Sequence, residues 1–215
     1  GSFTVDSKVY DGTDIADIFS VIATLDGGIF GVDDVFLDYD PLTATTTFDT
    51  ANAGIGKTVT FTGAFLNGVD AGNYTLTMST TTADITALGI TGSFTADSKV
   101  YDGLTAATVL TTDVLGVIGL DEVILTGGTA TFDTKDVGLN KTVTLAGATL
   151  TGAASGNYSL LSVATTTADI TALGITGNFT AANKVYDGAT SATVQTRTLT
   201  GVLAGAVANM SLTGG

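Results

Sequence analysis

The sequence predicts an all-β protein made of tandem repeats, and three observations support this prediction. The 215-residue chain is 44% hydrophobic and only 13% charged, and its many Val, Ile, Leu and Thr residues suit a pleated, half-buried surface. Apolar and polar residues alternate along short runs separated by glycine and aspartate, which is the pattern of strands and turns. Long blocks of sequence recur about 85 residues apart, which indicates one domain used repeatedly.

The repeated blocks divide the chain into two complete repeats and one incomplete repeat. The pentapeptide KVYDG occurs at residues 8–12, 99–103 and 184–188, and the block TTTADITALGITG at residues 80–92 and 165–177. A unit of this length is the size of one small domain. Repeat 1 has a longer insertion near residues 25–40, and repeat 3 covers only the first half of a unit. The predicted domains are residues 1–91 (repeat 1), 92–176 (repeat 2) and 177–215 (repeat 3).

Each repeat is expected to hold about six or seven strands, because the alternating runs are short and numerous. No long stretch has the 3.6-residue apolar period of a helix. The join between repeats, residues 87–92, has no flexible spacer, so we expect neighbouring domains to stack stiffly into a rod. The clearest expected strands are, in chain order, Thr58–Phe61, Tyr74–Met78, Ala83–Thr86, Val123–Leu125 and Thr142–Leu145.

A tyrosine motif narrows the choice among all-β folds. Residues 70–76 read Asp-Ala-Gly-Asn-Tyr-Thr-Leu and resemble the corner of immunoglobulin-like sandwiches, where a tyrosine hydroxyl bonds to the backbone and fixes the corner. Tyr74 holds this position in repeat 1, and Tyr158 holds it in repeat 2. The sequence therefore favours tandem Ig-like β-sandwich domains. A β-grasp-like repeat is the alternative, which a clear helix would support.

The composition excludes several classes of function. The chain has no His, Cys or Trp, so it holds no Ser-His-Asp triad, no cysteine nucleophile, no zinc or haem ligand set and no disulfide. A net charge of −14 argues against nucleic acid as a partner, because that binding needs a positive surface. No apolar run approaches the length of a transmembrane helix. We expect no enzyme, no catalytic residue and no cofactor, with a carboxylate-based glycosidase as the remote alternative.

The KVYDG motif is predicted to be a folding signature, because a motif present in every repeat of an array rarely marks an active site. Its Asp-Gly pair favours a tight turn. Val9 and Tyr10 should point to opposite faces, with the tyrosine ring covering the edge of the core. The residues given this structural role are Lys8, Tyr10, Asp11, Gly12, Lys99, Tyr101, Asp102 and Gly103, together with Tyr74 and Tyr158.

Acidic residues supply the candidate metal site, since Ca²⁺ takes oxygen ligands. Repeat 3 has Ala208 and Asn209 where the other repeats have an acidic pair, so the fold does not need that pair. Solvated turn charges are therefore favoured over calcium binding. The candidate ligands are Asp33, Asp34, Asp38 and Asp40 in repeat 1, and Asp121 and Glu122 in repeat 2.

Three blocks, KVYDG, FDTKDVGLNKTVTLAGATLTGAASGNYSL and TADIT, resemble in their order the YDG/MBG-type repeats of very large bacterial surface proteins. Those proteins include filamentous-haemagglutinin-like, two-partner-secreted adhesins and biofilm matrix proteins. The resemblance implies a structural or adhesive segment in an extracellular, cell-surface or matrix protein, forming a stalk, fibre or scaffold. It implies neighbouring repeats or copies of the chain as partners, and exopolysaccharide or a host or cell surface as further ones. A specific binding module for polysaccharide or protein is the alternative, although its usual aromatic platforms are scarce here.

Overall fold

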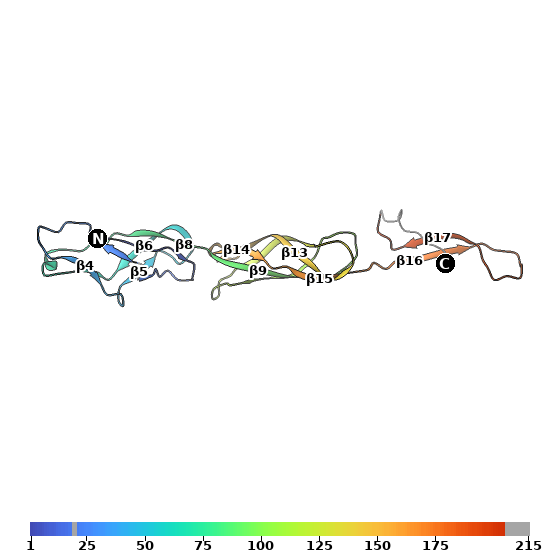
Figure 1. Cartoon of the computed structure of the whole chain (residues 1–215), viewed down its shortest axis with the longest axis horizontal. Coiled ribbons are helices and arrows are strands. Elements are labelled where there is room, and N and C mark those ends of the chain that lie inside the picture. Colours follow the sequence, from blue (N-terminus) through green and yellow to red (C-terminus); the bar gives the residue numbers. More distant parts are fainter. Residues whose placement is uncertain (19–20, 205–215) are drawn as a thin grey trace. The chain divides into compact units, whose positions relative to one another are not determined.

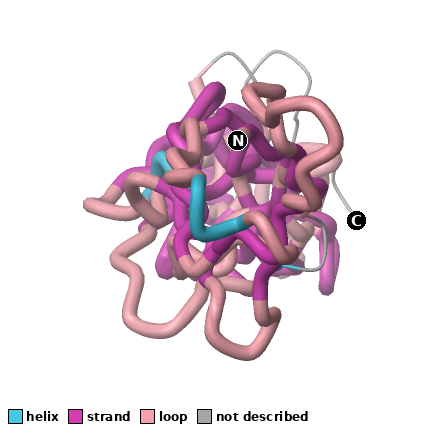
Figure 2. Tube along the Cα trace, turned by 90° about the vertical axis from the view of Figure 1, so that its left-hand side faces the viewer, coloured by secondary structure: helices cyan, strands magenta, loops and turns pink. Residues whose placement is uncertain are grey.

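The computed structural model describes residues 1–18 and 21–204, and within these residues it is all-β. No α-helix occurs there. Short 3-10 helices, η2 (Ala71–Asn73) and η3 (Ser155–Asn157), precede the two corner tyrosines, and Figure 2 shows how small the helical segments are beside the strands. The all-β prediction is confirmed. Ala208 and Asn209 lie outside the described residues.

The chain folds as two compact units whose limits differ from those of the sequence repeats. Unit 1 comprises Gly1–Gly92, Asp113–Gly127 and Ala148–Val163. Unit 2 comprises Ser93–Thr112, Gly128–Gly147 and the described residues from Ala164 onward. Unit 1 therefore contains repeat 1 together with the part of repeat 2 that carries Asp121 and Tyr158. The repeat boundaries themselves stay a prediction.

Repeat 1 forms a four-stranded sheet in the order β2-β8-β6-β5 and two small sheets, β1-β3 and β4-β7. β2 runs parallel to β8, and the other pairs are antiparallel; β5, β6 and β8 are labelled in Figure 1. The strands are β1 (Ser2–Thr4), β2 (Lys8–Val9), β3 (Ile22–Thr24), β4 (Phe36–Tyr39), β5 (Thr45–Phe48), β6 (Gly54–Thr62), β7 (Ala64–Asn67) and β8 (Thr81–Thr86).

Repeat 2 uses the same strand order, with β10-β15-β13-β12 in one sheet and β11-β9-β14 in another, and β16 pairs with β17 in repeat 3. β10 is parallel to β15, as β2 is to β8. The strands are β9 (Leu88–Ala96), β10 (Lys99–Val100), β11 (Val109–Leu115), β12 (Ile124–Phe132), β13 (Gly138–Thr151), β14 (Tyr158–Val163), β15 (Thr166–Thr171), β16 (Thr176–Ala181) and β17 (Val194–Thr200).

The period-two pattern explains how repeat 1 builds its core. Along β6, Val59 and Phe61 are buried, whereas the threonines that alternate with them, Thr58, Thr60 and Thr62, are exposed. Threonine therefore supplies β-propensity on the solvent-facing side of the strand. The Phe61 ring packs 5.5 Å from that of Phe3 in β1 and 5.3 Å from that of Tyr39 in β4, measured between centroids. Side chains from all three sheets of repeat 1 therefore share one core.

One expected strand differs between the repeats. In repeat 2, Tyr158–Val163 is strand β14, which pairs in parallel with Leu88–Gly92 of β9. In repeat 1, the expected strand Tyr74–Met78 forms no regular element. Its neighbour is Gly1, whose amino group donates to the Thr77 carbonyl at 2.6 Å and whose carbonyl accepts from the Ser79 N–H at 2.8 Å. These two bonds, both to one residue, do not make the ladder of paired residues that defines a strand.

Candidate functional site: the KVYDG ends and the tyrosine corners

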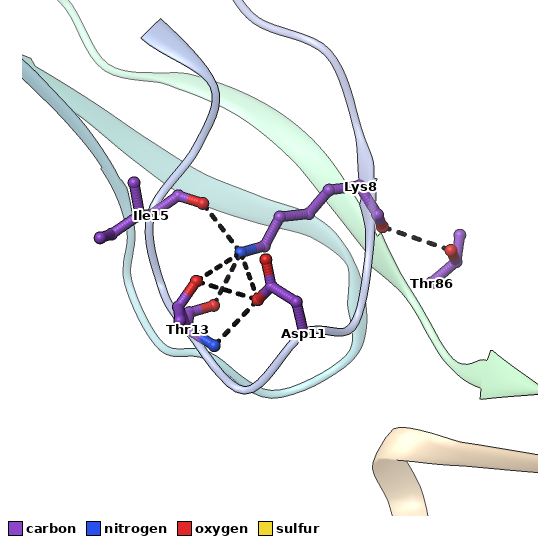
Figure 3. A network of polar contacts seen from close by, with 5 residues as sticks. All are labelled: Lys8, Asp11, Thr13, Ile15 and Thr86. Carbon is purple, nitrogen blue, oxygen red and sulfur yellow. Dashed lines mark hydrogen bonds and ion pairs between the residues drawn. The ribbon is translucent and has the colours of Figure 1, made fainter. Parts of the chain in front are cut away.

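The KVYDG lysine closes a loop with its ammonium group, as Figure 3 shows for repeat 1. Lys8 Nζ donates to Asp11 Oδ1 and to the carbonyl oxygens of Thr13 and Ile15, each at 2.8 Å. Asp11 Oδ1 also accepts the Thr13 N–H at 2.9 Å. Gly12 has φ +82°, a left-handed conformation that glycine adopts without strain. The motif is thus a turn held together by the ammonium group of one lysine, whose side chain is mostly buried.

The contact between this lysine and the aspartate three residues later recurs in the other two repeats. Lys99 Nζ donates to Asp102 Oδ1 and to the carbonyl oxygens of Leu104 and Ala106 at 2.8–2.9 Å. Lys184 Nζ donates to Asp187 Oδ1 at 2.8 Å. The Lys99 ammonium, with the Leu104 N–H, lowers the pKa of the Asp102 carboxyl. This geometry accounts for the co-occurrence of lysine and aspartate three residues apart in every copy of the motif.

Replacing Lys99 by methionine should lower the free energy of unfolding by about 1–3 kcal/mol, because one aspartate and two carbonyls lose their donor. The Lys99 side chain is 18% exposed, so water replaces the donor only in part. Urea unfolding would measure the change. Lys135→Met is the matched control, because that side chain is 52% exposed and lies 3.4 Å from Asp136; exposed pairs contribute little. Equal losses in the two variants would contradict the structural role of Lys99.

The sequence pattern did not lead us to predict a second lysine–aspartate pair, which repeats 1 and 2 both contain. Lys57 Nζ lies 2.6 Å from Asp49 Oδ1 and 2.6 Å from Thr50 Oγ1. Lys141 Nζ makes the equivalent contacts with Asp133 and Thr134 at 2.8 and 2.7 Å. The signal was present, because FDT is followed by KTVT at the same distance in both repeats.

The corner tyrosines bind a loop about forty residues earlier in the chain. Tyr74 Oη donates to Asp33 Oδ2 at 2.7 Å and accepts the Phe30 N–H at 2.9 Å. Tyr158 Oη donates to Asp121 Oδ2 at 2.5 Å and accepts the Ile118 N–H at 3.0 Å. Each hydroxyl therefore bonds to the backbone, as the motif led us to expect, and also to a carboxylate. We call these two arrangements the tyrosine corners.

Inside unit 1, the KVYDG tyrosine of repeat 1 meets the tyrosine corner of repeat 2. Tyr10 Oη donates to Asp121 Oδ2 at 2.8 Å, so this carboxylate oxygen accepts both tyrosine hydroxyls. The two rings pack edge to face with centroids 5.4 Å apart, and each residue is 6% exposed. The hydrogen bond to Asp121, with burial, raises the pKa of Tyr10 to about 12.

Asn157 adds two more bonds to this contact. Its Oδ1 accepts the Ala53 N–H at 2.9 Å, and its Nδ2 donates to Asn52 Oδ1 at 3.2 Å. Although Asn157 is polar, it is only 7% exposed, because residues of repeat 1 cover it. We call the contact of Tyr10, Asn52 and Ala53 with Asp121, Asn157 and Tyr158 the joint. In repeat 1, KVYDG thus has two roles: Lys8 fixes the turn, and Tyr10 contacts the next repeat.

The candidate calcium ligands do not converge. Asp33 and Asp121 accept tyrosine hydroxyls, Asp38 Oδ2 accepts the Asn67 side-chain amide at 3.1 Å, and Asp40 Oδ1 accepts the Leu42 N–H at 2.9 Å. The backbone carbonyls of Asp34 and Glu122 accept the N–H groups of Asp70 and Ala154, respectively. In residues 1–18 and 21–204, no group of three or more acidic side chains could hold a metal ion. The geometry therefore gives the calcium hypothesis no support.

The repeated sheets, lysine-held turns and joint define a tandem-repeat β-domain protein. Its described residues include no helix long and apolar enough to cross a membrane. The YDG domain family matches residues 2–83 and 86–168, more than half of the chain, and the chain belongs to this family. No curated protein and no solved structure matches it.

Proposed function

We propose that this chain is a structural and adhesive segment of a long bacterial extracellular or cell-surface protein, in which serial domains form a stalk, fibre or matrix scaffold. The joint is the observation that carries the proposal. Residues of one repeat, Tyr10 and Asn52, are bonded to the corner of the next, which is an arrangement suited to transmitting load along a chain of domains. The acidic charge of −14 would keep such an array soluble.

The proposal assigns Ig-like β-sandwich architecture to each domain. Its support is that the first strands of repeat 1 divide between two sheets, β1 pairing with β3 and β2 pairing with β8. Phe3 and Phe61, from these two sheets, pack against each other, as inner faces of a sandwich do. The tyrosine corners add a second resemblance to that class.

A structural role also agrees with the way the polar side chains are used. The lysines of the KVYDG motif bind carbonyls and aspartates of their own loops, and Asp33 and Asp121 accept tyrosine hydroxyls. No buried side-chain nitrogen or oxygen in the described part of the chain lacks a hydrogen-bond partner. These groups are therefore engaged in holding the fold, and the sequence offers no imidazole or thiol beside them.

Two measurements test the proposal. Immunogold labelling of the producing bacterium should place the chain on the cell surface or in the matrix, and label confined to the cell interior would contradict it. The purified chain should hydrolyse no polysaccharide in a glycan panel and should show no saturable binding that is specific for one glycan. Saturable binding would favour the alternative of a specific binding module, and turnover would favour the carboxylate glycosidase.

A further inference from the structure

Repeat 1 carries a second tyrosine corner with the same parts as the one in the joint. Phe30 takes the place of Ile118, because each donates its backbone N–H to the corner tyrosine. Asp33 corresponds to Asp121 in the same way, since each accepts the tyrosine hydroxyl. The remaining pairs in this correspondence are Asn73 with Asn157 and Tyr74 with Tyr158.

The two corners differ in what covers them. Asn157 and Tyr158 are 7% and 6% exposed under repeat 1, whereas Asn73 is exposed and Tyr74 is only half-buried. Phe30 is 78% exposed. Its counterpart Ile118 lies against the KVYDG turn, so that a Cβ added to Gly12 would stand 3.3 Å from its methyl group. Phe30 is therefore exposed at a position where repeat 2 is covered by the KVYDG turn of the repeat before it.

The two corners also differ in the number of tyrosine hydroxyls that the aspartate accepts. Asp121 Oδ2 accepts two tyrosine hydroxyls, one from its own repeat and one from Tyr10. Asp33 Oδ2 accepts the hydroxyl of Tyr74 and, as a carboxylate oxygen, has room for a second donor of the same kind.

The two corners differ as well in what lies beside the residues that begin with the corner tyrosine. In repeat 2, residues Tyr158–Leu160 pair with Leu88–Ile90 of β9. In repeat 1, a cavity of about 130 Å³ borders the corresponding residues, and its lining includes Gly1, Ile29, Tyr74, Thr75 and Leu76. Tyr74–Met78 consequently lacks the partner that makes its counterpart β14 a regular strand.

We propose that repeat 1 has a docking surface for the KVYDG turn of a YDG domain placed directly before Gly1 in the same polypeptide. This surface is formed by Phe30, Asp33, Asn73 and Tyr74. The incoming KVYDG tyrosine donates to Asp33, its turn covers Phe30, and its connecting segment pairs with Tyr74–Leu76. This inference rests on the proposed role of the repeats as serially connected structural domains.

The test places a second copy of residues 1–91 ahead of the full chain, which recreates the Thr-Gly junction found at residues 91–92. Because the chain has no cysteine, one introduced pair reports one contact. Asn52→Cys in the added copy and Asn73→Cys in the original repeat 1 should form a disulfide within a single polypeptide. The positive control is Asn52→Cys with Asn157→Cys in the unextended chain, where the two asparagines are already hydrogen-bonded.

Adding Phe30→Asp and Asp33→Ala to the original repeat 1 of the extended chain should slow this crosslink about tenfold, because the effective concentration of the two thiols falls when the domains no longer dock. Urea unfolding would verify that the extended chain folds both with and without these two substitutions. The proposal is overturned if the control pair crosslinks and the test pair does not, or if crosslinks form only between polypeptides, at doubled mass. Intramolecular crosslinking without surface label on cells would overturn only the proposed location.

Discussion

Replacing Tyr10 by alanine should lower the free energy of unfolding by about 3 kcal/mol, the usual loss for truncating a buried aromatic residue. It should also separate the unfolding of repeat 1 from that of repeat 2, since neighbouring repeats are coupled through their interfaces. The variant loses the hydrogen bond to Asp121 and the edge-to-face contact with Tyr158. Hydrogen exchange measured by mass spectrometry during urea unfolding would follow β6 and β14 separately.

The matched control for this variant is Tyr186→Ala, which alters the same pentapeptide in repeat 3. Tyr186 is 94% exposed, so its removal should change stability by less than about 0.5 kcal/mol. If the two alanine variants lose equal stability, Tyr10 acts through its own turn and not through the joint. Synchronous exchange of β6 and β14 in Tyr10→Ala would likewise show that the two repeats stay coupled without Tyr10, against this prediction.

Tyr10→Phe isolates the hydroxyl and makes the joint visible as a pH dependence. The pKa of Tyr10 is raised to about 12 in the folded chain, against about 10 in an unfolded one. Its contribution to stability is therefore complete below pH 10 and is lost as the pH rises through 12. Tyr10→Phe should remove this part of the alkaline fall. Part of the remainder should come from Tyr158, whose pKa burial and Asp121 also raise, and from Tyr74, whose pKa is raised as well.

The local pattern of the sequence was enough to predict most of the expected strands and the KVYDG turn, although Tyr74–Met78 forms no strand. TADIT became β8 and β15, KTVT lies within β6 and β13, and KVYDG closes a turn. These features depend on residues within about ten positions of each other, which alternation and turn chemistry can reveal. Val9 and Tyr10 also divide between solvent and core as predicted, at 52% and 6% exposure.

The partners of the site residues could not be predicted in the same way. Tyr10 and Tyr186 occupy identical pentapeptides, yet one is buried and the other is exposed, so the surroundings decide their roles. Tyr10 binds Asp121, which stands 111 residues later and belongs to the next repeat. Asp121, which the sequence suggested as a candidate calcium ligand, is the acceptor for two tyrosine hydroxyls. Only the path of the chain in space brings these groups together.

Gly152→Ala should be the most damaging substitution in the corner of repeat 2, with a loss of at least about 3 kcal/mol, because backbone strain and a backbone clash act together. Gly152 has φ +109°, and a Cβ there would lie well inside van der Waals contact with the Glu122 carbonyl oxygen. That oxygen receives the Ala154 N–H at 3.1 Å, so relieving the clash breaks this bond. Urea unfolding would measure the loss.

Gly156→Ala is the matched control, because it changes the same loop four residues away. Gly156 has ordinary backbone angles and no atom near the position of an added Cβ, so its loss should stay within about 1 kcal/mol. A Gly152→Ala loss as small as that of Gly156→Ala would contradict the clash.

The double variant Gly152→Ala/Tyr10→Ala then tests whether the corner loop acts through the joint. If displacing the loop moves Asn157 and Tyr158 away from repeat 1, the second substitution has less left to remove. The combined loss should therefore fall short of the sum by 0.5 kcal/mol or more, the usual size of coupling between residues in contact. Strict additivity would mean that the loop and the joint are independent, and that the glycine serves only the fold of its own repeat.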